Sequence, residues 1–222
     1  MARAFNTRSY KKTLRQMRRR DGATVGVDAS TDCSPIADAL VADGRQFVCR
    51  YYANSGAKRL SATELQNLRG AGLKVVVVWE DGLPTSANYF SFAKGVDDGT
   101  SAYHDALEIG QPTNTPIYFA IDYDATDADL AAGINDYFNG VTTGIKTAAN
   151  GGAVNSVGVY GSGATCRFAL ARGWATFTWL AMSSGWRGHD FPDWNIRQSQ
   201  GKTYGAIDVD SDGSSSNAFG AF

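Results

Sequence analysis

Four apolar, β-rich runs in this chain end on acidic side chains. The runs span residues 24–28, 75–80, 117–124 and 207–210, and their acidic residues are Asp28, Glu80, Asp122, Asp124, Asp208 and Asp210. Runs of this kind, separated by turn-forming residues, predict buried β-strands. In a barrel of parallel strands, all carboxyl ends meet at the face that carries the active site. The sequence therefore predicts one acidic pocket, which suits acid–base chemistry on a neutral polymer such as a glycan and suits a phosphate poorly.

Helix signals lie between the strands, such as Ser34-Pro35 and the capping box from Ser61 to Glu64. We expect eight strands, at residues 24–28, 47–52, 73–80, 117–123, 156–160, 178–181, 195–198 and 206–210. This alternation predicts an α/β fold, a compact (β/α)8 TIM-like barrel with some helices reduced to loops. The alternative is an open doubly wound sheet, which usually carries a Gly-rich phosphate loop after its first strand; none follows residue 28.

Basic residues are concentrated at the start of the chain. Residues 1–20 hold eight Lys and Arg and no acid, whereas the remainder carries all 22 acids and only 13 of the 21 bases. We therefore expect a basic N-terminal arm over residues 1–20 and one barrel domain over residues 21–222. No apolar segment of a secretory signal follows the arginines. The arm is predicted to dock on another protein of a larger assembly, such as a phage virion or injection particle directed at a cell wall. A loose tail or self-association is the alternative, and neither a membrane nor a nucleic-acid partner is expected.

The pair Asp122 and Asp124 carries the main chemical prediction. Side chains two residues apart on a strand share a face, and the backbone positions lie roughly 6.6 Å apart. This spacing lets one carboxyl group protonate a leaving oxygen while the other orients water or substrate. Asp28 and Asp208 would complete the catalytic group from neighbouring strand ends. Carboxylates at strand ends also cap helices, which is the structural alternative for each one taken singly.

Aromatic and polar residues near the same strand ends are candidates for binding sugar rings, because aromatic side chains present flat apolar faces. The candidate substrate-binding residues are Glu80, Tyr52, Trp79, Tyr160, Trp179, Gln198 and Asp210. No metal or cofactor is predicted: the two histidines lack zinc spacing, and the calcium-like start at Asp208 has Phe219 in place of the final Glu. The three cysteines are interpreted as buried small hydrophobic residues.

The ordered set of motifs resembles the glycoside-hydrolase-like domain once catalogued as a domain of unknown function and related to family 25 lysozymes. The motifs cover residues 24–212: Val27-Asp28-Ala29-Ser30, Arg50-Tyr51-Tyr52, Trp79-Glu80, Asp122-Tyr123-Asp124, Val159-Tyr160-Gly161, Trp179-Leu180-Ala181 and Ile207-Asp208-Val209-Asp210. The resemblance implies a modified TIM barrel that cleaves bacterial cell-wall glycan. It implies Asp124 as general acid and Asp122 as stabiliser of the reacting sugar. At the position of Asp124, however, the lysozymes carry Glu, whose side chain is one methylene longer.

We therefore expect a glycoside hydrolase acting on peptidoglycan or a related amino-sugar polymer. The alternative is a non-catalytic barrel that binds wall glycan or serves as a structural piece of a particle.

Overall fold

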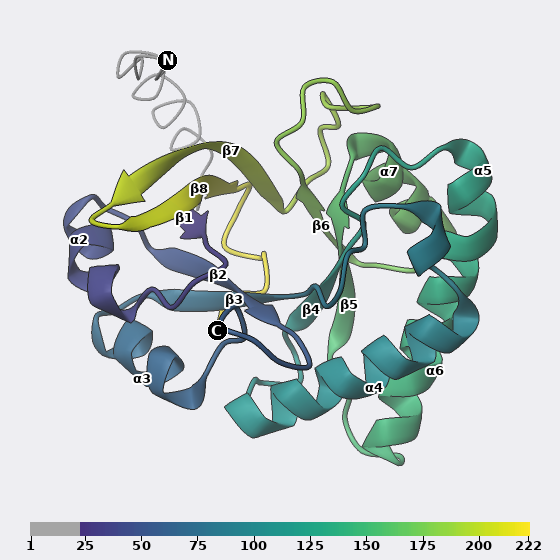
Figure 1. The fold of residues 1–222 in the computed structure, drawn as a ribbon, viewed down its shortest axis with the longest axis horizontal. Coiled ribbons are helices and arrows are strands. Elements are labelled where there is room, and N and C mark those ends of the chain that lie inside the picture. The colour runs from purple at the N-terminus through teal and green to yellow at the C-terminus, as the bar shows by residue number, and fades with distance from the viewer. Residues whose placement is uncertain (1–22) are drawn as a thin grey trace.

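Eight strands close into a barrel in the computed structural model, which describes residues 23–222. The strands follow one another around the barrel in chain order (Figure 1). They are β1 (Val25–Asp28), β2 (Phe47–Tyr52), β3 (Lys74–Trp79), β4 (Pro116–Ala120), β5 (Ser156–Gly161), β6 (Phe177–Leu180), β7 (Ile196–Tyr204) and β8 (Ile207–Ser214). The predicted barrel is confirmed. The predicted basic arm at residues 1–20 lies outside the described residues.

Helices fill most connections between the first six strands. They are η1 (Ser34–Ile36), α2 (Ala37–Ala42), α3 (Ala62–Gly70), η2 (Ala87–Tyr89), α4 (Phe92–Ile109), α5 (Asp127–Asp129), η3 (Leu130–Ile134), α6 (Asn135–Ala149) and α7 (Gly163–Arg172). Residues 181–195, between β6 and β7, form turns and no helix. This connection confirms that part of the helical layer is reduced to loops. None of the helices described here is long and apolar enough to cross a membrane.

The last strand runs opposite to the expected direction. β1 to β7 pair in parallel along the chain, but β8 is antiparallel to both β7 and β1. A short turn at Gly205 joins β7 to β8, and so short a connection forces the chain to reverse. The expectation that β8 points its carboxyl end at the active face is therefore wrong. The start of β8 reaches that face instead, and the β7–β8 hairpin extends along one side of the barrel (Figure 1).

Successive side chains of each strand divide the core into two parts. Phe47, Cys49, Val76, Val78 and Trp179 belong to the cluster that fills the barrel interior. Their neighbours along the strands, including Val48, Val75 and Val77, belong to the larger cluster under the helices. Strands buried on both faces are typical of parallel sheets covered by helices. This alternation decides which residues of each strand can reach the mouth of the barrel.

Close backbone contact joins α4 and α6, which lie side by side in Figure 1. A Cβ atom at Gly99 of α4 would lie 2.4 Å from the backbone oxygen of Val141, and one at Gly144 of α6 would lie 2.2 Å from that of Val96. The glycines that weaken the helical signal of α4 therefore permit this packing.

We expect Gly99→Ala to lower the free energy of unfolding by about 1–3 kcal/mol, because the added methyl group forces the two backbones apart. Urea denaturation measures the change. Gly70→Ala is the matched control, since a Cβ atom there meets nothing within 4 Å and alanine favours a helix. Equal stabilities of the two variants would contradict close packing at Gly99.

Candidate functional site

Polar side chains from seven strands or their ends surround the mouth of the barrel. They follow the inward-facing positions of the strands and come from β1, β2, β3, β4, β5, β7 and β8 in turn: Asp28, Tyr51, Glu80, Asp122, Tyr160, Gln198, Asp210 and Asp212. Several of these groups lie around the Tyr160 hydroxyl, which donates to Gln198 Oε1. Burial raises the pKa of this hydroxyl well above the usual value, and the charges of Asp122, Asp28, Asp212 and Glu80 raise it further.

Gln198 links the carboxyl groups of β1 and β8. Its Nε2 donates to Asp28 Oδ2 at 2.9 Å and to Asp210 Oδ2 at 3.3 Å. Its Oε1 accepts from the Tyr160 hydroxyl and from the backbone N–H of Met182, both at 3.1 Å. These four contacts fix which end of the amide faces the carboxyl groups. The prediction that Gln198 belongs to the site agrees with this placement.

Asp28 is buried at the centre of this network, with only 4% of its surface exposed. Its Oδ1 accepts from the Tyr51 hydroxyl at 3.4 Å, and the register places it opposite Asp210 of β8. Burial raises the pKa of Asp28 to about 6, although the neighbouring Asp212 and the hydrogen bond from Gln198 act in the opposite direction. Burial also raises the pKa of Asp210.

Asp122 faces the mouth from just beyond β4. Its backbone N–H donates to the carbonyl of Pro84 at 2.9 Å, which holds the chain in place after the strand ends. Burial raises its pKa to about 6, and the nearby charge of Glu80 contributes in the same direction. Glu80 forms an ion pair with Lys58 at 3.1 Å. A carboxyl group with this pKa can hold a proton in mildly acidic solution.

Asp124 has different surroundings from Asp122. β4 ends at Ala120 rather than at the expected Tyr123, and the chain bends at Tyr123. Asp124 Oδ1 accepts from the backbone N–H of Arg187 at 3.0 Å and lies 3.6 Å from its Nε atom. β4 ends before either residue, so strand alternation does not set the orientation of Asp122 and Asp124, and their shared face stays a prediction.

Two predicted substrate-binding aromatics lie away from the mouth. Tyr52 and Trp79 are 0% and 1% exposed and pack in the core beneath the helices, where the Tyr52 hydroxyl donates to Gln111. Both point outward from the barrel, so the expectation that they stack on sugar is wrong. Trp179 points inward but is buried below the mouth, where its Nε1 donates to Asp212 Oδ1 at 2.9 Å. It supports a carboxyl group and presents no free face.

Sequence reasoning missed Tyr51 and Asp212. Tyr51 shares the inward face of β2 with Cys49 and contacts Asp28, so the tyrosine of β2 that reaches the mouth is one residue before the predicted Tyr52. Asp212 continues the two-residue spacing of Asp208 and Asp210 and is 1% exposed. That spacing was the available signal, but the expected strand stopped at Asp210.

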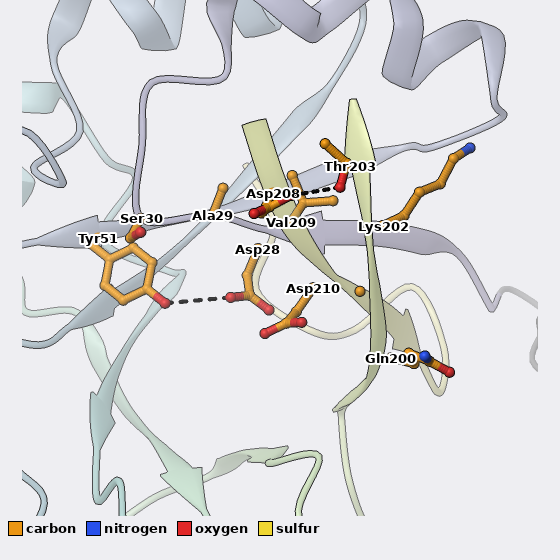
Figure 2. A pocket seen from close by; sticks show the side chains of 11 residues that line it. Asp28, Ala29, Ser30, Tyr51, Gln200, Lys202, Thr203, Asp208, Val209 and Asp210 are labelled. Carbon is orange, nitrogen blue, oxygen red and sulfur yellow. Dashed lines mark hydrogen bonds between the residues drawn. The ribbon is translucent and has the colours of Figure 1, made fainter. Parts of the chain in front are cut away.

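A pocket of about 760 Å³ lies between the mouth and the β7–β8 hairpin. Asp28, Tyr51 and Asp210 form its inner end, and Asp208 and Thr203 lie on the hairpin (Figure 2). Asp208 is exposed and accepts from the Thr203 hydroxyl at 2.6 Å. The structure therefore places Asp208 on the pocket wall, outside the group around Tyr160, while Asp210 belongs to both.

A sequence model of the Rv2525c-like, glycoside hydrolase-like domain matches residues 38–214. Two curated relatives come from Bacillus subtilis (strain 168). The uncharacterized protein FadG is 31% identical over 194 residues, which cover 81% of this chain and 33% of FadG. The uncharacterized protein YbfG is 30% identical over 235 residues, which cover 94% of this chain and 32% of YbfG. The chain spans about a third of the length of these relatives.

Solved structures share the fold. The Tat-secreted protein Rv2525c of Mycobacterium tuberculosis, solved in complex with HEPES, aligns with a TM-score of 0.74 at 21% identity, covering 89% of this chain and 98% of that chain. The modular autolysin LytC of Streptococcus pneumoniae aligns with a TM-score of 0.56 at 14% identity, covering 86% of this chain and 46% of that chain. LytC has also been solved with a synthetic peptidoglycan ligand.

Proposed function

Because the chain belongs to the Rv2525c-like, glycoside hydrolase-like family, we propose that its barrel mouth binds an amino-sugar polymer such as bacterial peptidoglycan and hydrolyses it. The observation that carries the proposal is the placement of Asp28, which is buried, and Asp122, which is half-buried, among the polar groups around Tyr160 at the barrel mouth. Burial raises the pKa of each carboxyl group to about 6. Carboxyl groups tuned to this range supply both partners that glycoside hydrolysis needs. The solved LytC complex with a peptidoglycan ligand supports the substrate class by analogy.

Asp122 is the proposed proton donor. It gives its proton to the glycosidic oxygen as the bond to the sugar breaks, and a water molecule then adds to the sugar and restores the proton. Asp28, held by Tyr51 and Gln198, stabilises the positive charge that develops on the ring. Glu80, Tyr160 and Asp210 are proposed to bind sugar hydroxyl groups. Asp124 has the weaker claim to donate the proton, because its Oδ1 already accepts from the backbone N–H of Arg187 and lies 3.6 Å from the Arg187 Nε atom.

The direct test is incubation of the protein with purified peptidoglycan, followed by mass spectrometry of the soluble products. We expect fragments from cleavage of the glycan strand, with intact peptide stems. An absence of products across acidic and neutral pH would contradict the proposed hydrolysis.

The pH dependence of cleavage follows from the two raised pKa values. Asp122 must be protonated, which favours pH below about 6, and Asp28 must be ionised, which favours pH above about 6. We expect kcat/KM to peak near pH 6 and to fall about tenfold for each pH unit at the limits of the profile. Measurement from pH 4 to pH 9 checks this, and a flat profile would contradict a mechanism with two carboxyl groups.

A second candidate function is glycan binding without cleavage. The observation that favours it is the ion pair of Asp124 with Arg187, at the position where the lysozyme resemblance expects the acid. Co-sedimentation of the wild-type protein with insoluble peptidoglycan, together with the absence of released fragments, would support binding alone.

A further inference from the structure

Asp28 and Asp212 are buried together beneath the mouth of the barrel. They are 4% and 1% exposed, and each carboxyl group lies close enough to the other to influence its pKa. The register explains the contact: Asp212 lies opposite Gly26, which has no side chain, and Asp28 is the next residue on the same face of β1. Diagonal neighbours of this kind lie within reach of each other across a ladder.

The two carboxyl groups differ in their hydrogen-bond partners. Asp28 accepts at both oxygens, from the Tyr51 hydroxyl and from Gln198 Nε2. Asp212 accepts at Oδ1 from Trp179 Nε1, but its buried Oδ2 has no donor in the part of the chain that the structure describes. A buried oxygen that accepts nothing is satisfied when it carries a proton and donates it. A hydrogen bond between two carboxyl groups needs such a proton.

Electrostatics leads to the same assignment. The charged groups that act most strongly on Asp212 are Asp28 and Asp210, and both are acidic. Two adjacent buried carboxylates raise the free energy of the folded protein, because each loses its hydration and the two charges repel. Protonation of one of them removes the repulsion. The other groups that face Asp212 from neighbouring strands are a thiol, three phenols, an indole and an amide, and none of them carries a positive charge. They are Cys49, Tyr51, Tyr118, Tyr160, Trp179 and Gln198.

We infer that Asp212 is a neutral carboxylic acid at neutral pH and that its Oδ2–H group donates to Asp28. Asp212 is thereby a positioning residue: it lets Asp28 remain an anion in a buried site and directs its carboxylate towards the mouth. Its effect on glycan cleavage rests on the proposed function, whereas the location of the proton does not.

Carbon-13 NMR of the full chain, labelled at the aspartate carboxyl carbons, tests the location of the proton. At pH 7 we expect one carboxyl signal at the position of a protonated acid. Asp212→Asn should remove this signal, and Asp210→Asn, the matched control on the same strand, should retain it. The inference is overturned if no protonated signal is present at pH 7, or if Asp210→Asn removes the signal.

Stability gives a second readout. A folded state that retains a proton lost on unfolding becomes less stable as pH rises above the usual aspartate pKa of 3.8. The ratio of the unfolding constants of wild type and Asp212→Asn should therefore rise about tenfold for each pH unit from pH 5 to pH 7. A ratio that does not change with pH would overturn the inference.

Cleavage assays separate positioning from the location of the proton. Asn at position 212 can accept from Trp179 and donate to Asp28, so Asp212→Asn should keep kcat/KM within a few-fold of wild type. Asp212→Leu fills similar volume without a donor and should lose activity. Equal losses in both variants would overturn the positioning role. If the wild-type protein cleaves no glycan, the proposed function fails. The NMR and stability results still decide whether Asp212 carries the proton.

Discussion

Asp122→Asn is expected to lower the rate of glycan cleavage at least ~100-fold while leaving the barrel folded, because general acid catalysis contributes on this scale. The amide has the shape of the acid but no proton to give to the leaving oxygen. Asp122 is half-buried, and among residues 23–222 no side-chain hydrogen bond depends on its carboxyl group. The substitution should therefore act on chemistry rather than on folding. Product release measured by mass spectrometry, with an unfolding curve on the same sample, checks both parts.

Asp124→Asn is the matched control, since it lies two residues away. We expect it to lose less activity than Asp122→Asn, because the Asp124 carboxylate already contacts Arg187. If the rate of glycan cleavage falls ~100-fold in Asp124→Asn and stays near normal in Asp122→Asn, the general acid is Asp124, as the lysozyme resemblance implies. Near-normal activity in both variants would contradict either assignment.

Strand-end reasoning predicted the main carboxylates of the mouth. Asp28 and Asp122 belong to different runs of sequence, and the barrel brings both to the group around Tyr160. The two residues come together because parallel strands of a barrel expose their carboxyl ends on one face, whatever the details of packing. The expected end of β4 at Tyr123 is wrong, because the backbone leaves the strand at Ala120 and a single run of apolar residues does not reveal where the ladder ends.

The choice between Tyr51 and Tyr52 could not be made from the sequence. β2 is apolar on both faces, so hydrophobic alternation does not indicate which residues point inward. Only the closed barrel assigns Cys49 and Tyr51 to the interior and Tyr52 to the core under the helices. Likewise, the inward position of Asp212 depends on the β7–β8 reversal, which a single strand pattern does not contain.

Glu64→Gln is expected to lower the free energy of unfolding by about 3–5 kcal/mol, because it leaves the Arg50 guanidinium buried without its counter-charge. Arg50 and Glu64 side chains are 0% and 1% exposed, and they form an ion pair at 2.5 Å. Glu64 also accepts from the backbone N–H of Cys33 at 2.9 Å, and Arg50 donates to the carbonyl of Ala29. The pair thus joins α3 and β2 to the segment that follows Asp28.

Two comparisons isolate the buried charge as the cause. Glu108→Gln removes a partner of Arg59 that is 62% exposed, and a surface pair of this kind contributes about 0–1 kcal/mol. The double variant Arg50→Met/Glu64→Leu removes both charges and should recover part of the stability that Glu64→Gln loses. Urea denaturation at pH 7 measures all three. A loss below about 1 kcal/mol in Glu64→Gln would show that Arg50 finds water or another acceptor, and that this ion pair does not hold the segment carrying Asp28 in place.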